Sequence, residues 1–370
     1  MSRPSNTPGS TAVAPSDTDL APAAPAAPAD SSAGRSPLLK ALSFRNMSAV
    51  YIFVLLFIVF ALWTPDSFLA TGTWRSLLDA EAITALAALA ALIPLLTGAF
   101  NLAVGAEVGL GGILAAVLLA KAGWSVPVTV AVTLFAGAMV GLVSGLIITK
   151  VKIDSFIATL GMSSILSAAI AWLSDSQQVL GLGTEFSKLA LTQIFGITLP
   201  VYLLLIVAIV AWYMAERTPM GRRMYAVGYN PDGARLAGIN NARLQIGSLM
   251  AGGVLASLAG ILLTARINVG DPSLGPSLLL PALTAVFLGS TQFRGGRFNV
   301  WGTVVAVYVL AVGIKGLQLV GAPNWINLLF NGLALLIAVG LARWERTSKW
   351  TGAIRRATTF RRNKTEPTPV

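Results

Sequence analysis

The side chains best suited to catalysis and metal binding are missing from this chain. Its 370 residues include no His and no Cys. Without them there is no thiolate ligand, no disulfide and none of the imidazole groups that most often bind metals. The phosphate-binding pattern of Gly, four residues, Gly, Lys and Ser or Thr is also absent from the sequence. We therefore expect no catalytic residue, no metal site, no cofactor and no ATPase activity in this chain.

A few polar side chains stand inside apolar runs, where they could line a path for a polar solute. A charge at the centre of a bilayer costs at least about 2.5 kcal/mol, so such residues usually face a cavity or a partner. A neutral sugar is bound by amides, hydroxyls and aromatic rings, which supply donors and acceptors without net charge. The candidate pathway residues are Phe100, Asn101, Glu107, Thr159, Ser163, Lys315 and Gln318.

Several of these residues have a simpler structural explanation. Thr159 and Ser163 can donate to carbonyl groups of their own helix instead of facing a pathway. Glu107 and Lys315 could form an ion pair, but the helical rise places Glu107 nearer the inner face and Lys315 nearer the outer face. Separate hydrated cavities, or side chains that reach the interface, are the alternatives for these two residues.

The segment 217–241 is polar and separates two long apolar runs. It reads RTPMGRRMYAVGYNPDGARLAGINN, and five Arg lie between positions 217 and 243. Asn230 suits a helix N-cap and Pro231 the first helical position, while Gly238 suits the residue that ends a helix. These signals predict a short helix over about 232–237, placed where a transporter would meet a soluble partner. The alternative is a solvated basic loop that only follows the topology rule.

The composition predicts an all-α polytopic membrane protein. Hydrophobic residues make up 55% of the chain, charged residues only 11%, and the mean hydropathy is +0.75. The apolar runs lack the alternation of barrel strands, so helices must satisfy the backbone in lipid. The third span is rich in Gly and closely follows the second, so one of these two spans is expected to be broken or to cross incompletely, and Pro interrupts the short eighth span. The ten expected spans are 47–63, 77–97, 102–120, 126–149, 156–174, 198–215, 243–265, 277–292, 300–320 and 325–342.

The distribution of basic residues predicts ten crossings with both termini in the cytoplasm. In that arrangement the inner segments hold most Lys and Arg, as the positive-inside rule requires. The outer loops hold only Arg75, Lys121, Lys188 and Arg266. Because the net charge of +11 sits in loops and tails, it indicates a membrane topology and no nucleic-acid partner.

Three regions follow from this layout. Residues 1–36, rich in Ala, Pro, Ser and Thr, are predicted to be a disordered cytoplasmic tail. Residues 37–346 form the expected transmembrane domain, and 347–370 a basic cytoplasmic tail. Small residues are dense in 136–145 and 251–260, which predicts closely packed helices.

Four stretches of the chain carry a family resemblance. They read FIATLGMSSI (156–165), GRRMYAVGYNPDGARLAGIN (221–240), ASLAGILLTAR (256–266) and FLGSTQFRGGRFNVWGT (287–303). They resemble the permease subunits of bacterial ATP-binding-cassette (ABC) sugar importers of the ribose, xylose and galactose type. The second stretch is the most specific, because its Gly, Arg, Asn-Pro and Ala-Arg-Leu-X-Gly-Ile elements match in order and spacing.

The resemblance implies a type II ABC-importer-like bundle in the bacterial cytoplasmic membrane. Such a permease forms a homodimer in the lipid bilayer, binds cytoplasmic ABC ATPase subunits and receives sugar from an extracytoplasmic binding protein. In this family a short helix of the inner loop lies in a groove on the ATPase. The coupling residues carried over to this sequence are Gly221, Arg222, Arg223, Asn230, Pro231, Ala234, Arg235 and Gly238.

The sequence also departs from the family's pattern on the membrane side. Residues 99–105 read AFNLAVG where Gly-Ile-Asp-Leu-Ser-Val-Gly is common, and 278–282 read LLLPA where Tyr-Glu-Leu-Asp-Ala is common. Lys315 stands where Asn is usual. The coupling segment keeps the pattern, so we expect preserved machinery and a cargo that is a monosaccharide or a related small polar solute.

Three other functions remain as alternatives. The same architecture could carry branched-chain amino acids, nucleosides or a signalling furanose. An ion-coupled secondary carrier would place paired acidic groups at the midplane and show inverted repeats, and we find no convincing repeat. A purely structural membrane protein would leave the segment 217–241 unexplained.

Overall fold

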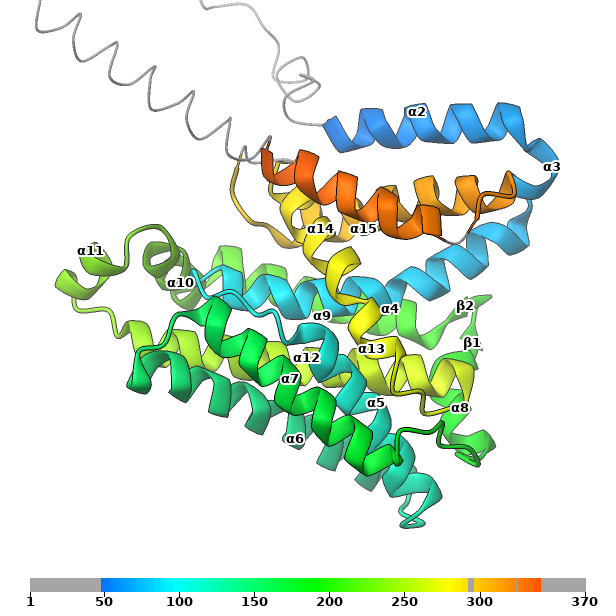
Figure 1. The fold of residues 1–370 in the computed structure, drawn as a ribbon. Helices are drawn as coiled ribbons and strands as arrows, with labels where there is room; N and C mark the ends of the chain where they lie inside the picture. The colour runs from blue at the N-terminus through cyan, green and yellow to red at the C-terminus, as the bar shows by residue number, and fades with distance from the viewer. Residues whose placement is uncertain (1–47, 292–295, 324, 341–370) are drawn as a thin grey trace, which may run out of the picture. The chain divides into compact units, whose positions relative to one another are not determined.

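Helices dominate the structure, which is a computed structural model describing residues 48–291, 296–323 and 325–340. These residues belong to one compact unit, Ala41–Val370. The other unit, Met1–Lys40, and the two predicted tails lie outside the described residues. In chain order the helices are α2 (Ser48–Trp63), α3 (Pro65–Phe68), α4 (Thr71–Leu95), α5 (Val104–Ala120), α6 (Val126–Leu146), α7 (Ser155–Ser174), α8 (Thr184–Leu191), α9 (Leu199–Arg217), α10 (Pro219–Tyr229), α11 (Pro231–Leu236), α12 (Asn241–Ile267), α13 (Leu274–Ser277), α14 (Leu279–Ser290) and α15 (Val300–Leu319) (Figure 1).

Four further elements complete the described chain. A π-helical turn at Ile147–Val151 extends α6. Strands β1 (Gln193–Ile194) and β2 (Ile197–Thr198) pair antiparallel, and an apolar helix covers Trp325–Gly340. The short hairpin is a small departure from the all-α expectation.

Every predicted apolar span coincides with a helix. Within the described residues, six helices are long and apolar enough to cross a membrane, namely α4, α6 with its π-helical turn, α7, α9, α12 and α15. Shorter apolar helices occupy the other predicted spans, namely α2, α5, α13 with α14, and Trp325–Gly340. The protein is therefore a mostly helical, polytopic membrane protein.

One helix boundary differs from its predicted span, and one break within a span agrees with the prediction. Helix α4 begins at Thr71, not at residue 77, because its first turns are polar and give no hydropathy signal. The eighth predicted span is divided into α13 and α14, as its prolines indicated. Helix α13 packs closely on α5, since a Cβ at Gly275 would come within 2.3 Å of the Cα of Gly109. The glycines of α5 therefore permit backbone contact, and α5 itself is a continuous helix of 17 residues.

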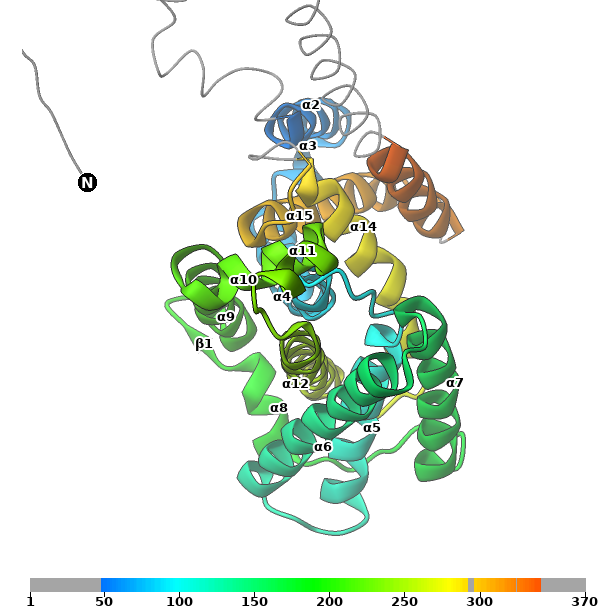
Figure 2. The same ribbon diagram turned by 90° about the vertical axis from the view of Figure 1, so that its left-hand side faces the viewer.

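Helix α12 lies among α4, α5 and α6 and contacts all three (Figure 2). The contact with α6 is backbone against backbone, because a Cβ at Gly137 would come within 2.4 Å of the carbonyl oxygen of Gly253. On the α5 side, a Cβ at Gly260 would meet the carbonyl oxygen of Val108. The small residues of 136–145 and 251–260 thus serve close helix packing, as predicted.

Helix α4 forms the centre of the main hydrophobic core. Leu86, Leu89 and Leu92 are fully buried, and the residues around them on α4 are apolar on every side. A helix that is apolar all round is buried all round. Helix α4 therefore runs between the two ends of the bundle enclosed by other helices.

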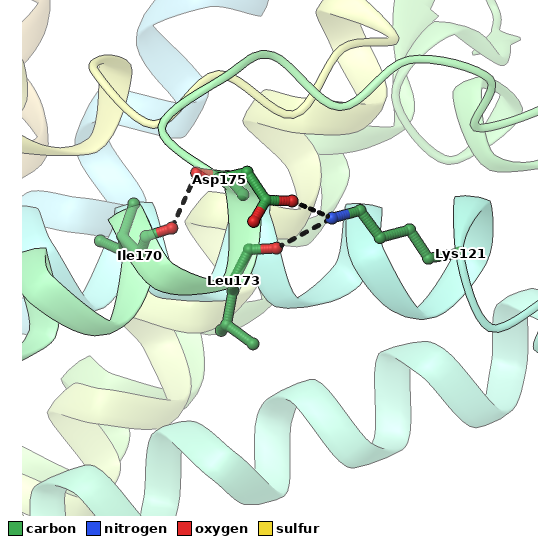
Figure 3. A network of polar contacts seen from close by, with 5 residues as sticks. Lys121, Ile170, Leu173 and Asp175 are labelled. Carbon is green, nitrogen blue, oxygen red and sulfur yellow. Dashed lines mark hydrogen bonds and ion pairs between the residues drawn. The ribbon is translucent and has the colours of Figure 1, made fainter.

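The helices leave two ends that carry different loops. The C-terminus of α4 and the N-termini of α7 and α12 lie at the α10–α11 end, where the amide of Phe100 donates to Ser155 Oγ at 3.1 Å. At the opposite end, Lys121 Nζ after α5 donates to Asp175 Oδ2 at 2.9 Å and to the carbonyl of Leu173 at 3.3 Å (Figure 3). This ion pair is exposed, so it adds little to stability.

Candidate functional site

The predicted pathway residues fall into two separate groups. Asn101, Glu107 and Thr159 form one buried polar cluster near the α10–α11 end. Asn101 Nδ2 donates to Glu107 Oε2 at 3.0 Å, and Asn101 Oδ1 accepts from the amide of Ala103 at 3.0 Å. The cluster therefore fixes the chain as it passes from α4 into α5.

Glu107 is the most constrained member of this cluster. Only 2% of the residue is exposed. Its Oε1 atom has no hydrogen-bond partner among the described residues. A buried carboxylate with one free oxygen is costly, so Asn101 contributes strongly to holding it.

Thr159 and Ser163 take different positions on α7. Thr159 is fully buried, and its hydroxyl donates to the carbonyl of Ser155 at 2.7 Å and accepts from the amide of Leu102 at 3.1 Å. Thr159 therefore makes the hydrogen bond to its own helix that the simpler explanation predicted, and it also binds the amide of Leu102. Ser163 is half-buried, and its carbonyl accepts from Ser167.

Phe100 lies beside this cluster and faces the α10–α11 end. Its ring stacks on Phe287 with 6.5 Å between centroids. Both rings line a cavity of about 290 Å³ together with Tyr225, Tyr229 and Phe298. The aromatic candidate therefore belongs to the junction between the bundle and α10.

Lys315 and Gln318 lie in the second group, away from Glu107. They line a cavity of about 130 Å³ beside Glu81 and Ser76. Glu107 pairs with Asn101, whereas Lys315 shares its cavity with Glu81. No ion pair between Lys315 and Glu107 is present in the described structure.

The sequence reasoning missed the polar residues next to this second group. Glu81 also lines a larger cavity of about 370 Å³, together with Asn327 and Asn331. Glu81 lies inside the predicted span 77–97, so its charge in an apolar run was an available signal. Asn327 and Asn331 are four residues apart in the span 325–342, so they share one helix face.

The segment 217–241 folds into two helices, α10 and α11, one more than predicted. Helix α11 has Asn230 as its N-cap, whose Oδ1 accepts from the amide of Gly233 at 2.9 Å, and it begins at Pro231. Gly238 follows the helix with φ of +78°, a conformation that glycine adopts at little cost. Its amide donates to the carbonyl of Arg235, and that of Ile239 donates to Ala234, which is the Schellman pattern.

The predicted coupling residues divide into exposed and buried ones. Arg222, Arg223 and Arg235 are exposed, whereas Gly221 and Ala234 are buried. A Cβ at Gly221 would overlap the carbonyl oxygen of Ala215, so this glycine holds α10 against the end of α9. The buried residues shape the segment, and the arginines remain available to a partner.

Leu236 was not predicted as a coupling residue. It is 90% exposed at the end of α11. An apolar side chain that projects so far from a folded element has a position suited to a pocket on another protein. Its signal in the sequence was a single Leu between Arg235 and Ala237, which hydropathy does not distinguish from a core position.

Helix α10 contacts the bundle through an aromatic residue and a glycine. Tyr225 Oη donates to the carbonyl of Phe298 at 2.8 Å, and the guanidinium carbon of Arg297 lies 3.7 Å from the centre of its ring. Burial raises the pKa of the Tyr225 hydroxyl, and the positive charge of Arg297 opposes part of that shift. A Cβ at Gly228 would lie 2.5 Å from the carbonyl oxygen of Leu96. A displacement of α10 would therefore also displace the backbone at the end of α4.

Comparisons with known proteins place the whole bundle in one family. The family model described as "Branched-chain amino acid transport system / permease component" matches residues 76–339. The ribose import permease of Escherichia coli (strain K12) is 32% identical over 310 residues, covering 83% of this chain and 96% of that protein. The ribose import permease of Bacillus subtilis (strain 168) is 33% identical over 294 residues, covering 79% and 90%.

A relative with a different sugar in its name is similarly close. The fructose import permease of Rhizobium meliloti is 30% identical over 305 residues, covering 80% of this chain and 84% of that protein. No solved structure matches the chain. The chain belongs to the family of transport-system permease components described above, and it is a multi-pass protein of the inner membrane.

Proposed function

We propose that this chain is the membrane-spanning permease subunit of an ABC importer that carries a monosaccharide or a related small polar solute. Its energy would come from ATP hydrolysis on separate subunits, since the sequence has no phosphate-binding motif. The observation that carries the proposal is the α10–α11 surface, defined by the exposed residues Arg222, Arg223, Arg235 and Leu236. This surface is formed by folded helices with capped N-termini. A solvated basic loop that only followed the topology rule would not need such a structure.

The α10–α11 surface has the chemistry of a docking site. Leu236 supplies an apolar anchor, and the neighbouring arginines supply positive charge for acidic groups on a partner. Asn241 Nδ2 donates to the carbonyl of Pro231 at 2.8 Å, so α11 is tied to the start of α12. We infer that an ATPase pressing on α11 would move α12, the helix that contacts α4, α5 and α6.

The membrane arrangement we propose has ten crossings with both termini in the cytoplasm. The ten apolar helices and the basic residues at the α10–α11 end support it. The hairpin and α8 then face outward, where an extracytoplasmic binding protein would deliver the solute. Relatives named as sugar import permeases support the import role. The assembly that we propose also includes a permease homodimer.

Two cargo classes are separated by the comparisons. The family description names branched-chain amino acids, but relatives about 30% identical over most of the chain are named as ribose and fructose import permeases. The individual relatives that the chain matches over most of its length carry sugar names, so we favour a monosaccharide.

The test is transport by the reconstituted complex. The permease, the ATPase and the binding protein encoded beside it would be assembled in proteoliposomes and offered labelled D-ribose, D-xylose, D-fructose and L-leucine. The proposal expects ATP-dependent uptake of at least one sugar, and none when the ATPase is left out. Uptake of leucine alone, or uptake driven by an ion gradient without ATP, would overturn it.

A further inference from the structure

The cavity between α4, α13–α14, α15 and the helix Trp325–Gly340 is lined by an unusual set of polar groups for a membrane bundle. Its volume of about 370 Å³ is within the range of small-molecule sites. Apolar side chains such as Val307 and Leu310 form its other walls. The polar residues that line it are Glu81, Thr84, Ser277, Asn327 and Asn331.

Two of these polar groups have unused hydrogen-bonding capacity. The side-chain oxygens of Asn327 and Asn331 are buried and have no hydrogen-bond partner in the described part of the chain. Asn331 is only 6% exposed. Buried amides without partners are costly, and in native proteins they usually mark a bound molecule or a functional role.

The polar groups come from helices that are far apart in sequence. Glu81 and Thr84 are three residues apart on α4, and Asn327 and Asn331 are four apart on the last described helix, so each pair shares one face. Ser277 at the end of α13 lies in the same lining. Carboxylate, amide and hydroxyl groups therefore meet around one volume.

A second, smaller cavity adjoins this set through shared residues. Glu81, Ala311 and Ile314 line both volumes, and Lys315 and Gln318 line the smaller one. Neither Glu81 nor Lys315 takes part in an ion pair among the described residues. Glu81 and Lys315 therefore line the smaller cavity together.

We propose that the larger cavity is a solute-binding site within the membrane domain, and that it takes a neutral polyhydroxylated molecule of monosaccharide size. Glu81 accepts hydrogen bonds from hydroxyl groups, and the amides of Asn327 and Asn331 both donate and accept. Lys315 and Gln318 line the smaller cavity that adjoins this site. This inference rests on the proposed import function and adds the residues that recognise the cargo.

The experiment uses the full importer in proteoliposomes with labelled D-ribose, D-xylose and D-fructose. Asn331→Leu removes the hydrogen bonds of the amide to a hydroxyl, and Glu81→Gln replaces one acceptor oxygen of the carboxylate by a donor; the loss of one such bond reduces transport about tenfold. Thr133→Val is the matched control, because Thr133 is a fully buried α6 residue with an unpartnered hydroxyl that does not line the cavity. The control should transport as the wild type does.

Readouts beyond uptake separate recognition from folding. The inference expects normal amounts of assembled permease, ATPase stimulation by the binding protein that is retained, and a changed ratio of ribose to xylose uptake in Asn331→Ser. If Asn331→Leu does not assemble, Asn331→Ser and Glu81→Gln decide the question by the same ratio.

Each outcome distinguishes this inference from the proposed function. Wild-type rates and wild-type sugar ratios in the assembled cavity variants would overturn the cavity assignment while leaving the importer intact. A wild-type complex that takes up none of the sugars would overturn the proposed function itself.

Discussion

Gly228 at the end of α10 and Gly98 just after α4 lie backbone against backbone. A Cβ built on Gly98 would be 3.4 Å from the Cα of Gly228, and one built on Gly228 would be 2.5 Å from the carbonyl oxygen of Leu96. This contact joins the α10–α11 surface to residues 96–103, which hold Phe100 and Asn101. It is a direct backbone route from α10 to the segment that leads into α5.

Gly228→Ala should interrupt this route. The added methyl must displace backbone, which costs about 1–3 kcal/mol in a packed interior. We expect ATP-dependent uptake to fall about tenfold while the ATPase subunits remain bound. Gly161→Ala is the control, because a Cβ there meets nothing within 4 Å. Equal uptake by the two variants would show that the Gly228 contact does not transmit motion.

Asn101→Leu should destabilise the protein through Glu107. The variant leaves the buried carboxylate without its amide donor, a loss of about 1–3 kcal/mol. We expect a lower melting temperature in detergent and less folded protein in membranes. The double variant Asn101→Leu with Glu107→Met should recover part of this loss, because it removes both partners. An unchanged melting temperature for Asn101→Leu would return Asn101 to a pathway role.

The loop after α12 should make a small, pH-dependent contribution. The hydroxyl and the amide of Ser273 donate to Asp271 Oδ1 and lower the pKa of that carboxyl group, and Gln178 donates to Oδ2. Stability from a lowered pKa is present above the ordinary carboxyl pKa and is lost as pH falls through the folded value. We expect Asp271→Asn to reduce the drop in melting temperature between pH 7 and acid. The same drop in both proteins would contradict this assignment.

The absence of Cys makes topology directly measurable. Phe195→Cys on the hairpin, at a residue 97% exposed, and Leu236→Cys on α11 are single thiols in an otherwise Cys-free chain. A membrane-impermeant maleimide added to spheroplasts should label Phe195→Cys only, and inverted vesicles should reverse the result. Labelling of both residues from one side would refute the ten-crossing arrangement.

Local signals predicted the coupling segment better than the membrane interior. The cap at Asn230, the turn at Gly238 and the break between α13 and α14 were all predicted from single residues with strong conformational preferences. Helix α10 was missed, although Thr218 caps it and Pro219 begins it, because its mixed polar and apolar sequence lacks a clear period.

The contacts between distant helices could not be predicted from the sequence. The pairing of Glu107 with Asn101, six residues away, depends on the turn between α4 and α5. The cavity shared by Glu81 and Asn331 depends on two helices about 250 residues apart packing side by side. Hydropathy identified the apolar spans, but it does not state which face of each helix meets which neighbour.

The proposal that an ATPase docked on α11 drives sugar import is best tested by ATP-driven sugar uptake by the complex carrying Leu236→Asp, compared with Leu236→Met. The acidic variant places a charge where the apolar anchor would enter the ATPase, whereas the methionine keeps an apolar side chain of similar size. Leu236→Asp should lose both ATPase binding and uptake, and Leu236→Met should retain both. Wild-type uptake by Leu236→Asp would show that α11 does not dock on the ATPase.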